Sequence, residues 1–194
     1  MKKILSLFTL LSLICVGVYA QGISGGLKFG LNLANTTVSA EGLTTSPSFR
    51  PTIHAGGYLT AMLSEKFGIQ PEVLYSGMGY KQGEAVFKAN YITLPVLVRY
   101  NFTNIFSIHA GPQIGFLMSA KADYGQGDEE DLKDSVKGTD IGIAAGLGVD
   151  LPMGLNFGFR FVKGMTNINE ESDDYKYKNY ALQFSVGYKL FGKK

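Results

Sequence analysis

The sequence predicts an all-β fold, an eight-stranded antiparallel up-and-down transmembrane β-barrel. Three observations lead to this prediction. Apolar residues alternate with small or polar residues along most of the chain, 25 of the 194 residues are glycine, and long connections alternate with short ones. A period of two is typical of β-strands, and a strand tilted across a bilayer needs only about 9–11 residues.

Eight segments carry the alternation in chain order. In the first, Leu27, Phe29 and Leu31 alternate with Lys28 and Gly30, and each later segment repeats this arrangement. The predicted strands are 23–33, 52–63, 67–76, 91–101, 106–119, 140–151, 155–161 and 182–190.

The connections between these segments differ in length. The long ones are about 36–50, 80–88, 121–138 and 166–178, and the short ones are 64–66, 103–104 and 152–154. Short periplasmic turns and longer extracellular loops are typical of bacterial outer-membrane barrels. With the N-terminus on the periplasmic side, the four long connections are expected outside the cell.

The two faces of the strands predict which side meets lipid. One face is almost wholly aliphatic or aromatic, and the other mixes small, polar and charged residues. Gly142, Gly146 and Gly148 share this second face and leave room for bulky side chains opposite. The interior of an eight-stranded barrel is narrow, so the bulky set is expected to face lipid. The alternative is a soluble lipocalin-like barrel that binds a small apolar ligand inside.

The first twenty residues predict export. Lys2 and Lys3 precede an apolar run, and the stretch closes on a small-residue cleavage pattern that ends at Ala20. This order is typical of a cleaved secretory signal peptide, 1–20, followed by one barrel domain, 21–194. A membrane-anchor helix would need a longer apolar run. The predicted location is the outer membrane of a diderm bacterium.

Composition excludes several function classes. Lys and Arg number 18 against 16 Asp and Glu, and a nucleic-acid-binding protein would normally carry a clustered basic surplus. One cysteine cannot form a disulfide framework, and two histidines leave little for a zinc centre. We therefore expect no cofactor, no bound metal and no catalytic residues. We also expect the protein to be a monomer surrounded by outer-membrane lipid.

Charged and imidazole side chains with inward parity are expected to form a polar network that fills the barrel. Among them, Glu72 and Arg99 lie on neighbouring predicted strands and are expected to pair. Buried charges are tolerated when they are paired or hydrated, so the network is interpreted as a structural plug rather than a pore. Its predicted members are Lys28, His54, Glu72, Arg99, His109, Asp140 and Arg160.

Acidic residues gather in the last two long connections. They suit solvated surface loops, and the alternative is a site for a divalent cation or a protein partner. The candidates are Asp123, Asp128, Glu129, Glu130, Asp131, Glu170, Glu171, Asp173 and Asp174. Tyr124, Tyr175, Tyr177 and Tyr180 lie nearby and are expected in the outer aromatic girdle, a partner-binding patch being the alternative.

Several short motifs point to a family. Gly30-Leu31-Asn32, the run Tyr91 to Val96 with Arg99-Tyr100, and Ala110-Gly111-Pro112 resemble the PorT-type family of outer-membrane β-barrel domains, over the whole mature chain. That family is similar in architecture to the eight-stranded OmpA and OmpX barrels. The resemblance implies an integral, non-enzymatic outer-membrane protein whose loops serve binding or assembly. An accessory role in type IX protein secretion and a lipid-A-modifying enzyme are the alternatives.

Overall fold

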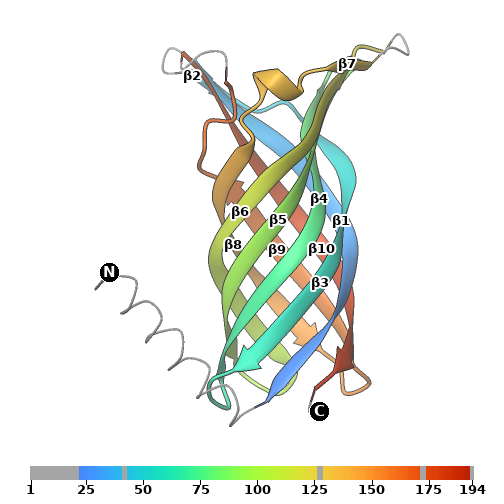
Figure 1. The fold of residues 1–194 in the computed structure, drawn as a ribbon, viewed down its shortest axis with the longest axis vertical. Helices are drawn as coiled ribbons and strands as arrows, with labels where there is room; N and C mark the ends of the chain where they lie inside the picture. The colour runs from blue at the N-terminus through green and yellow to red at the C-terminus, as the bar shows by residue number, and fades with distance from the viewer. Residues whose placement is uncertain (1–21, 41–42, 126–128, 171–173, 193–194) are drawn as a thin grey trace, which may run out of the picture.

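The computed structural model describes residues 22–40, 43–125, 129–170 and 174–192 (Figure 1). The predicted signal peptide, 1–20, lies outside these residues. The elements are β1 (Ile23–Ala40), β2 (Leu43–Thr45), β3 (Ser48–Met62), β4 (Phe67–Gln82), β5 (Ala85–Asn101), β6 (Phe106–Asp123), β7 (Glu129–Asp131), the 3₁₀ turn η1 (Lys133–Ser135), β8 (Thr139–Asp150), β9 (Leu155–Gly164) and β10 (Tyr175–Phe191).

Eight of the strands close into a ring. Antiparallel pairing runs through β1, β3, β4, β5, β6, β8, β9 and β10, and β10 pairs again with β1. The closing register runs from Gly25 opposite Phe191 to Ala40 opposite Tyr175. The short strands β2 and β7 extend β1 and β6 at one end of the barrel (Figure 1). The predicted fold class is therefore confirmed.

The three short turns lie at the end of the barrel where β1 begins and β10 ends (Figure 1). In two of them a hydroxyl tightens the turn. Ser64 Oγ accepts a hydrogen bond from the Phe67 N–H at 3.0 Å, and Thr103 Oγ1 accepts one from the Phe106 N–H at 2.9 Å. Serine and threonine favour such local turns for this reason. We refer to this end as periplasmic and to the other as the outer end.

At the outer end the predicted long connections are partly wrong. The segment 80–88 contains only a tight turn at Gly83 and Glu84, because β4 continues to Gln82 and β5 begins at Ala85. Gly83 has φ +62°, which suits glycine in such a turn. The backbone ladder continues past the lipid layer, but water replaces lipid there. The apolar alternation therefore ends before the strands do.

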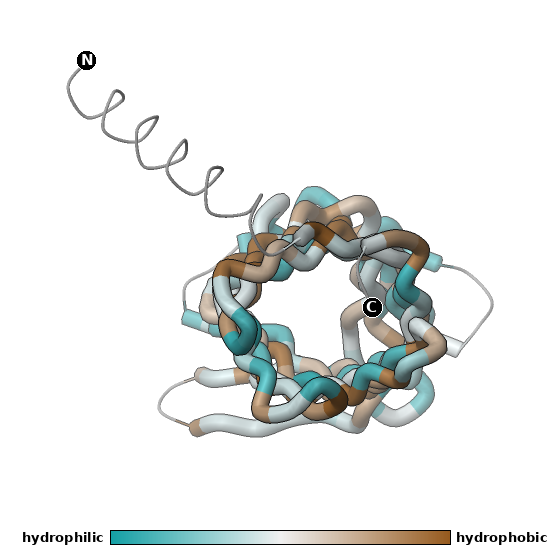
Figure 2. The backbone as a smooth tube through the Cα atoms, turned by 90° about the horizontal axis from the view of Figure 1, so that it is seen from below, coloured by the Kyte–Doolittle hydropathy of each residue, from teal (hydrophilic) through white to brown (hydrophobic). Residues whose placement is uncertain are grey.

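Burial shows which face is outside. Leu27, Phe29 and Leu31 are 55–59% exposed, whereas Lys28 is 8% and Asn32 is 0% exposed. Exposed apolar side chains alternate with buried polar ones in the same way on the other strands of the ring. Figure 2 shows apolar and polar residues interleaved along the closed tube. A water-soluble protein would bury the apolar set. An apolar outer band around a polar interior is the arrangement of a membrane-spanning barrel.

Candidate functional site

Glu72 of β4 is the centre of the charged interior. Its carboxylate accepts a hydrogen bond from Lys28 Nζ of β1 at 2.7 Å and two from the Arg160 guanidinium of β9 at 2.9 and 2.8 Å. Gln70 Nε2 donates a further hydrogen bond at 2.6 Å. All four side chains are buried. One carboxylate thus holds two cations that come from different walls of the barrel.

His109 of β6 completes this cluster. Its Nε2 accepts a hydrogen bond from Arg160 Nε at 3.2 Å. Gly146 of β8 lies against the imidazole and the β9 backbone. A Cβ at that position would meet the Phe159 carbonyl oxygen first, and would be 2.8 Å from His109 Nε2 and 2.9 Å from the Arg160 Cα. The glycine therefore makes the room that its inward parity predicts.

The predicted pairing of Glu72 with Arg99 is wrong. Arg99 of β5 bonds instead to Asp150 of β8, to Gln70 Oε1 at 3.1 Å and to Asn101 Oδ1 at 2.9 Å. The register is the reason, since Arg99 lies opposite Gly68, four residues from Glu72 along β4. Arg99 therefore pairs with Asp150 nearer the periplasmic end, and Gln70 joins this pair to the Glu72 cluster.

His54 belongs to an uncharged group centred on Asn32. His54 Nδ1 and Asn32 Oδ1 are 2.6 Å apart, Asn32 Nδ2 donates to Ser76 Oγ at 3.0 Å, and Gln183 Nε2 donates to Asn32 Oδ1 at 3.1 Å. Gly30 lies beside the imidazole, where a Cβ would be 2.8 Å from His54 Nε2. Asn32 is missing from the predicted network because an uncharged amide gives no charge signal. Its inward parity is the signal that could have identified it.

Asp140 lies nearer the outer end and is separate from the other charges. Its Oδ2 accepts a hydrogen bond from Asn179 Nδ2 at 2.9 Å, and Asn179 also contacts the Tyr91 hydroxyl at 3.4 Å. Among the described atoms, Asp140 Oδ1 is buried without a hydrogen-bond partner. The predicted network is therefore several stacked groups rather than one cluster.

Little space remains between these side chains. The cavity beside Lys28, Arg99, His109 and Arg160 has a volume of about 30 Å³. That is about the volume one water molecule occupies in the liquid. The arrangement can cross-link opposite walls of the barrel, and the space that it leaves beside these side chains is about that of one water molecule.

Two of the loop acids, Glu129 and Asp123, are paired with lysines. Glu129 accepts hydrogen bonds from Lys88 at 2.7 Å and Lys121 at 2.9 Å, and Lys88 also reaches Asp123 at 3.0 Å. Lys88 and Lys121 hold the pKa of Glu129 below its usual value, and the Gly125 N–H, followed by Lys88, does the same for the pKa of Asp123. Glu130 accepts a hydrogen bond from the Tyr124 hydroxyl at 3.0 Å.

The remaining candidates for a cation site lie only partly within the described residues. Asp131 accepts a hydrogen bond from the Lys133 N–H at 2.9 Å. Asp128, Glu171 and Asp173 lie outside the described residues. Within the described part of the chain, which includes Glu170 and Asp174, no three His, Cys, Asp or Glu side chains are placed to hold a metal ion.

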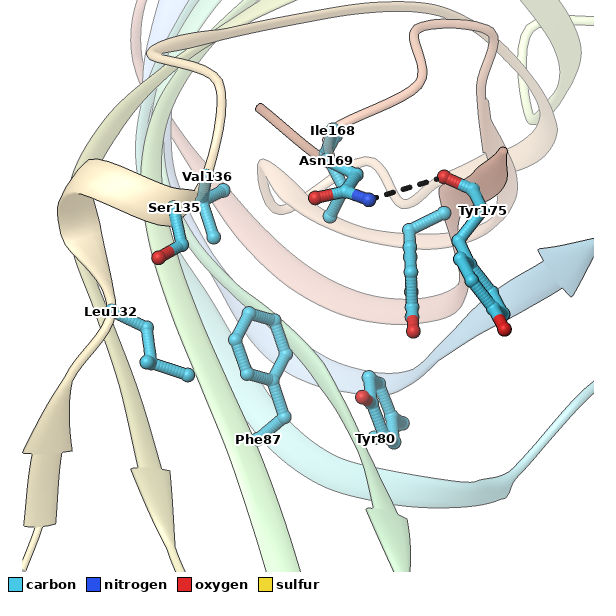
Figure 3. A pocket seen from close by; sticks show the side chains of 9 residues that line it. Tyr80, Phe87, Leu132, Ser135, Val136, Ile168, Asn169 and Tyr175 are labelled. Atoms are coloured by element: carbon cyan, nitrogen blue, oxygen red, sulfur yellow. Dashed lines mark hydrogen bonds between the residues drawn. The ribbon is translucent and has the colours of Figure 1, made fainter. Parts of the chain in front are cut away.

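A cavity of about 330 Å³ opens at the outer end of the barrel (Figure 3). Tyr80 of β4 and Phe87 of β5 form one wall, with ring centroids 5.3 Å apart and planes tilted by 31°. Tyr175 and Tyr177 of β10 form another. The lining is completed by Leu132, Ser135, Val136, Ile168 and Asn169.

A second cavity of about 620 Å³ lies beside the first and shares Tyr80, Tyr175 and Tyr177 with it. We call the two together the mouth cleft. The girdle predicted from four tyrosines is thus wrong for Tyr175 and Tyr177, since both line this cleft. Tyr180 does pack with outer-end aromatics, its ring lying 5.8 Å from Phe49 and 6.4 Å from Phe161. Phe87 was missed because residues 80–88 were expected to be a loop.

The closed ring, apolar outer face and polar interior define a membrane-spanning β-barrel of eight strands. A family model described as "Outer membrane protein beta-barrel domain" matches residues 19–170, and the chain belongs to that family. Its location is accordingly the outer membrane. No curated protein matches the chain in a sequence comparison. In the described residues, no helix is both long and apolar enough to span a bilayer.

Solved outer-membrane proteins share the fold. The attachment invasion locus protein Ail of Yersinia pestis is 14% identical, with a TM-score of 0.53 over 88% of this chain and 99% of Ail. Neisserial surface protein A (NspA) is 12% identical, with a TM-score of 0.53 over 84% of this chain and 97% of NspA. At such low identity the similarity extends to the fold alone.

Proposed function

We propose that this outer-membrane barrel is a non-enzymatic binding protein whose strands anchor a recognition site at the outer end. One observation carries the proposal. The interior beside Arg99 and Arg160 keeps a cavity of only about 30 Å³, whereas the two cavities of the mouth cleft have volumes of about 330 and 620 Å³. Ligand sites commonly have volumes of roughly 300–1,000 Å³ and sit in the mouths of β-barrels.

The positions of His54 and His109 support the proposal that the protein is not an enzyme. His54 is engaged with Asn32, and His109 accepts its hydrogen bond from Arg160. Both lie in the buried interior, away from the lipid that a lipid-A-modifying enzyme must reach. An imidazole acts as a general base when it is within reach of the proton it removes. The polar network gives these histidines a structural role instead.

The motifs that resemble the PorT-type family have structural roles in this chain. Gly30 makes room for His54, and Asn32 joins three interior side chains. Membership of that branch and an accessory role in type IX secretion both rest on the resemblance of these motifs. Export through cleavage after Ala20 is part of the same proposal.

Two measurements test the function. First, the purified protein in planar bilayers should give no steady open channel, because the interior is filled. Second, protein extracted from the outer-membrane fraction should bind a ligand from outside the cell. Replacement of Phe87 or Tyr177 should weaken that binding. Recovery of the protein in the soluble periplasmic fraction, or a steady conductance from the unmodified barrel, would overturn the proposal.

A further inference from the structure

We infer that the mouth cleft binds a neutral oligosaccharide, an inference that rests on the proposed binding function. Tyr80, Phe87, Tyr175 and Tyr177 bring four rings and three hydroxyl groups to one cleft. A tyrosine offers an apolar face and a polar tip, and a sugar ring likewise has an apolar C–H face and a rim of hydroxyls. The two surfaces are chemically complementary.

Charge in the cleft favours an uncharged ligand. Among the described residues, no charged side chain lines the smaller cavity, and Lys81 alone lines the larger one. Two basic residues near the outer strand ends, Lys88 and Lys121, are already committed, since both bond to Glu129. An anionic saccharide normally needs charge-assisted bonds from Arg or Lys. The cleft lacks such a set within the described residues.

In the smaller cavity, the backbone of the wall argues against an added peptide strand. The Ile168 N–H donates to the Tyr177 carbonyl at 2.9 Å, and the Lys137 N–H donates to the Ile168 carbonyl at 2.8 Å. A peptide that extends a sheet needs unpaired backbone groups at the edge. Here recognition falls to the rings and hydroxyls of the tyrosines, which offer an apolar face and a polar tip.

The size of the cleft favours several sugar units rather than one. Each cavity alone has the volume of a small-ligand site, and Tyr80, Tyr175 and Tyr177 line both. A chain of sugars can therefore contact the same three rings while it extends from one cavity into the other. The cleft also lies close to the end of the strands, Tyr80 being two residues from the end of β4. A soluble ligand outside the cell can reach it.

The experiment uses the full barrel in phospholipid nanodiscs, because detergents with sugar headgroups would compete for the cleft. Titration calorimetry is run with neutral maltohexaose, cellohexaose, laminarihexaose and xylohexaose, and with a sulfated hexasaccharide for comparison. We expect at least one neutral probe to bind with a Kd below about 1 mM. Phe87→Ala and Tyr177→Ala should each weaken that binding by about tenfold, as expected for removing a buried aromatic contact.

The matched control is Tyr188→Ala, which removes an exposed tyrosine near the periplasmic end. The affinity of this variant for the neutral probe should equal that of the unmodified protein. For each variant, the altered gel migration of the unheated barrel verifies that the protein is folded. Tyr80→Phe should give a smaller loss, because it removes the hydroxyl and keeps the ring.

Several results would overturn the inference. They are binding of no neutral probe up to about 10 mM, a preference for the sulfated probe, or binding that Phe87→Ala and Tyr177→Ala leave unchanged. If these variants instead abolish binding of a purified protein partner, the inference fails while the proposed binding function stands. If the outer end binds neither saccharide nor protein, both fail.

Discussion

Arg160 and Glu72 join opposite walls of the barrel. The two Nη atoms of Arg160 donate to the two carboxylate oxygens of Glu72 at 2.9 and 2.8 Å. Arg160 lies on β9 and Glu72 on β4, which are four strands apart in either direction around the ring of eight. A bidentate pair of this kind fixes both distance and orientation. It therefore cross-links walls whose separation the strand number sets, and it fills the space between them.

Replacement of Glu72 by alanine should strongly destabilise the barrel. The change leaves Lys28 and Arg160 buried with no shared anion, and breaking a buried pair from one side costs about 3–5 kcal/mol. The loss should appear as a lower temperature at which the folded band disappears in a gel-shift series. Glu65→Ala, an exposed acid in a periplasmic turn, is the control and should stay near the unmodified value. An equal shift in both variants would contradict the role assigned to Glu72.

This pairing also shows where prediction from sequence ends. Alternation assigned Glu72, Arg99 and Arg160 to the same interior, because parity depends only on position along each strand. The partners depend on register and on how the ring closes. Arg99 therefore pairs with Asp150, two strands away in the ring, and not with Glu72 on the neighbouring strand. The mouth cleft could not be predicted from the sequence for a related reason. The apolar alternation ends at the lipid boundary, whereas β4 and β5 continue beyond it.

Gly146→Ala should disturb the interior by overpacking. The new methyl group would be 2.8 Å from His109 Nε2 and 2.9 Å from the Arg160 Cα, closer than normal carbon contacts. Overpacking of a filled interior typically costs about 1–3 kcal/mol. Reversible urea unfolding in lipid vesicles measures the effect. Gly57→Ala is the matched control, because its nearest atom, the Gly26 carbonyl oxygen, would be 3.6 Å away. A control that loses as much stability would exclude crowding as the cause.

Leu31→Arg tests the lipid-facing surface directly. Leu31 is 57% exposed on the outer wall of β1, and an arginine on the lipid face costs about 2–4 kcal/mol near the bilayer midplane. The same unfolding measurement in vesicles should show this loss. Leu43→Arg places the same charge on β2, where the leucine is 79% exposed beyond the barrel wall, and should change stability by less than about 0.5 kcal/mol. A tolerated arginine at position 31 would mean that this face meets water.

The β7 hairpin should loosen as the pH falls. Hydrogen bonds from Lys88 and then Lys121 hold the pKa of Glu129 below its usual value of 4.5. A carboxyl whose folded pKa is depressed stabilises the folded form fully above its unfolded pKa, and the contribution is lost as the pH falls through the folded value. Hydrogen exchange of Glu129, Glu130 and Asp131, corrected for intrinsic rates, should therefore accelerate between about pH 5 and pH 3. Glu129→Gln should remove most of this pH dependence, and Glu65→Gln should leave it intact. Exchange that is independent of pH in the unmodified protein would mean that the two lysines do not hold β7 in place.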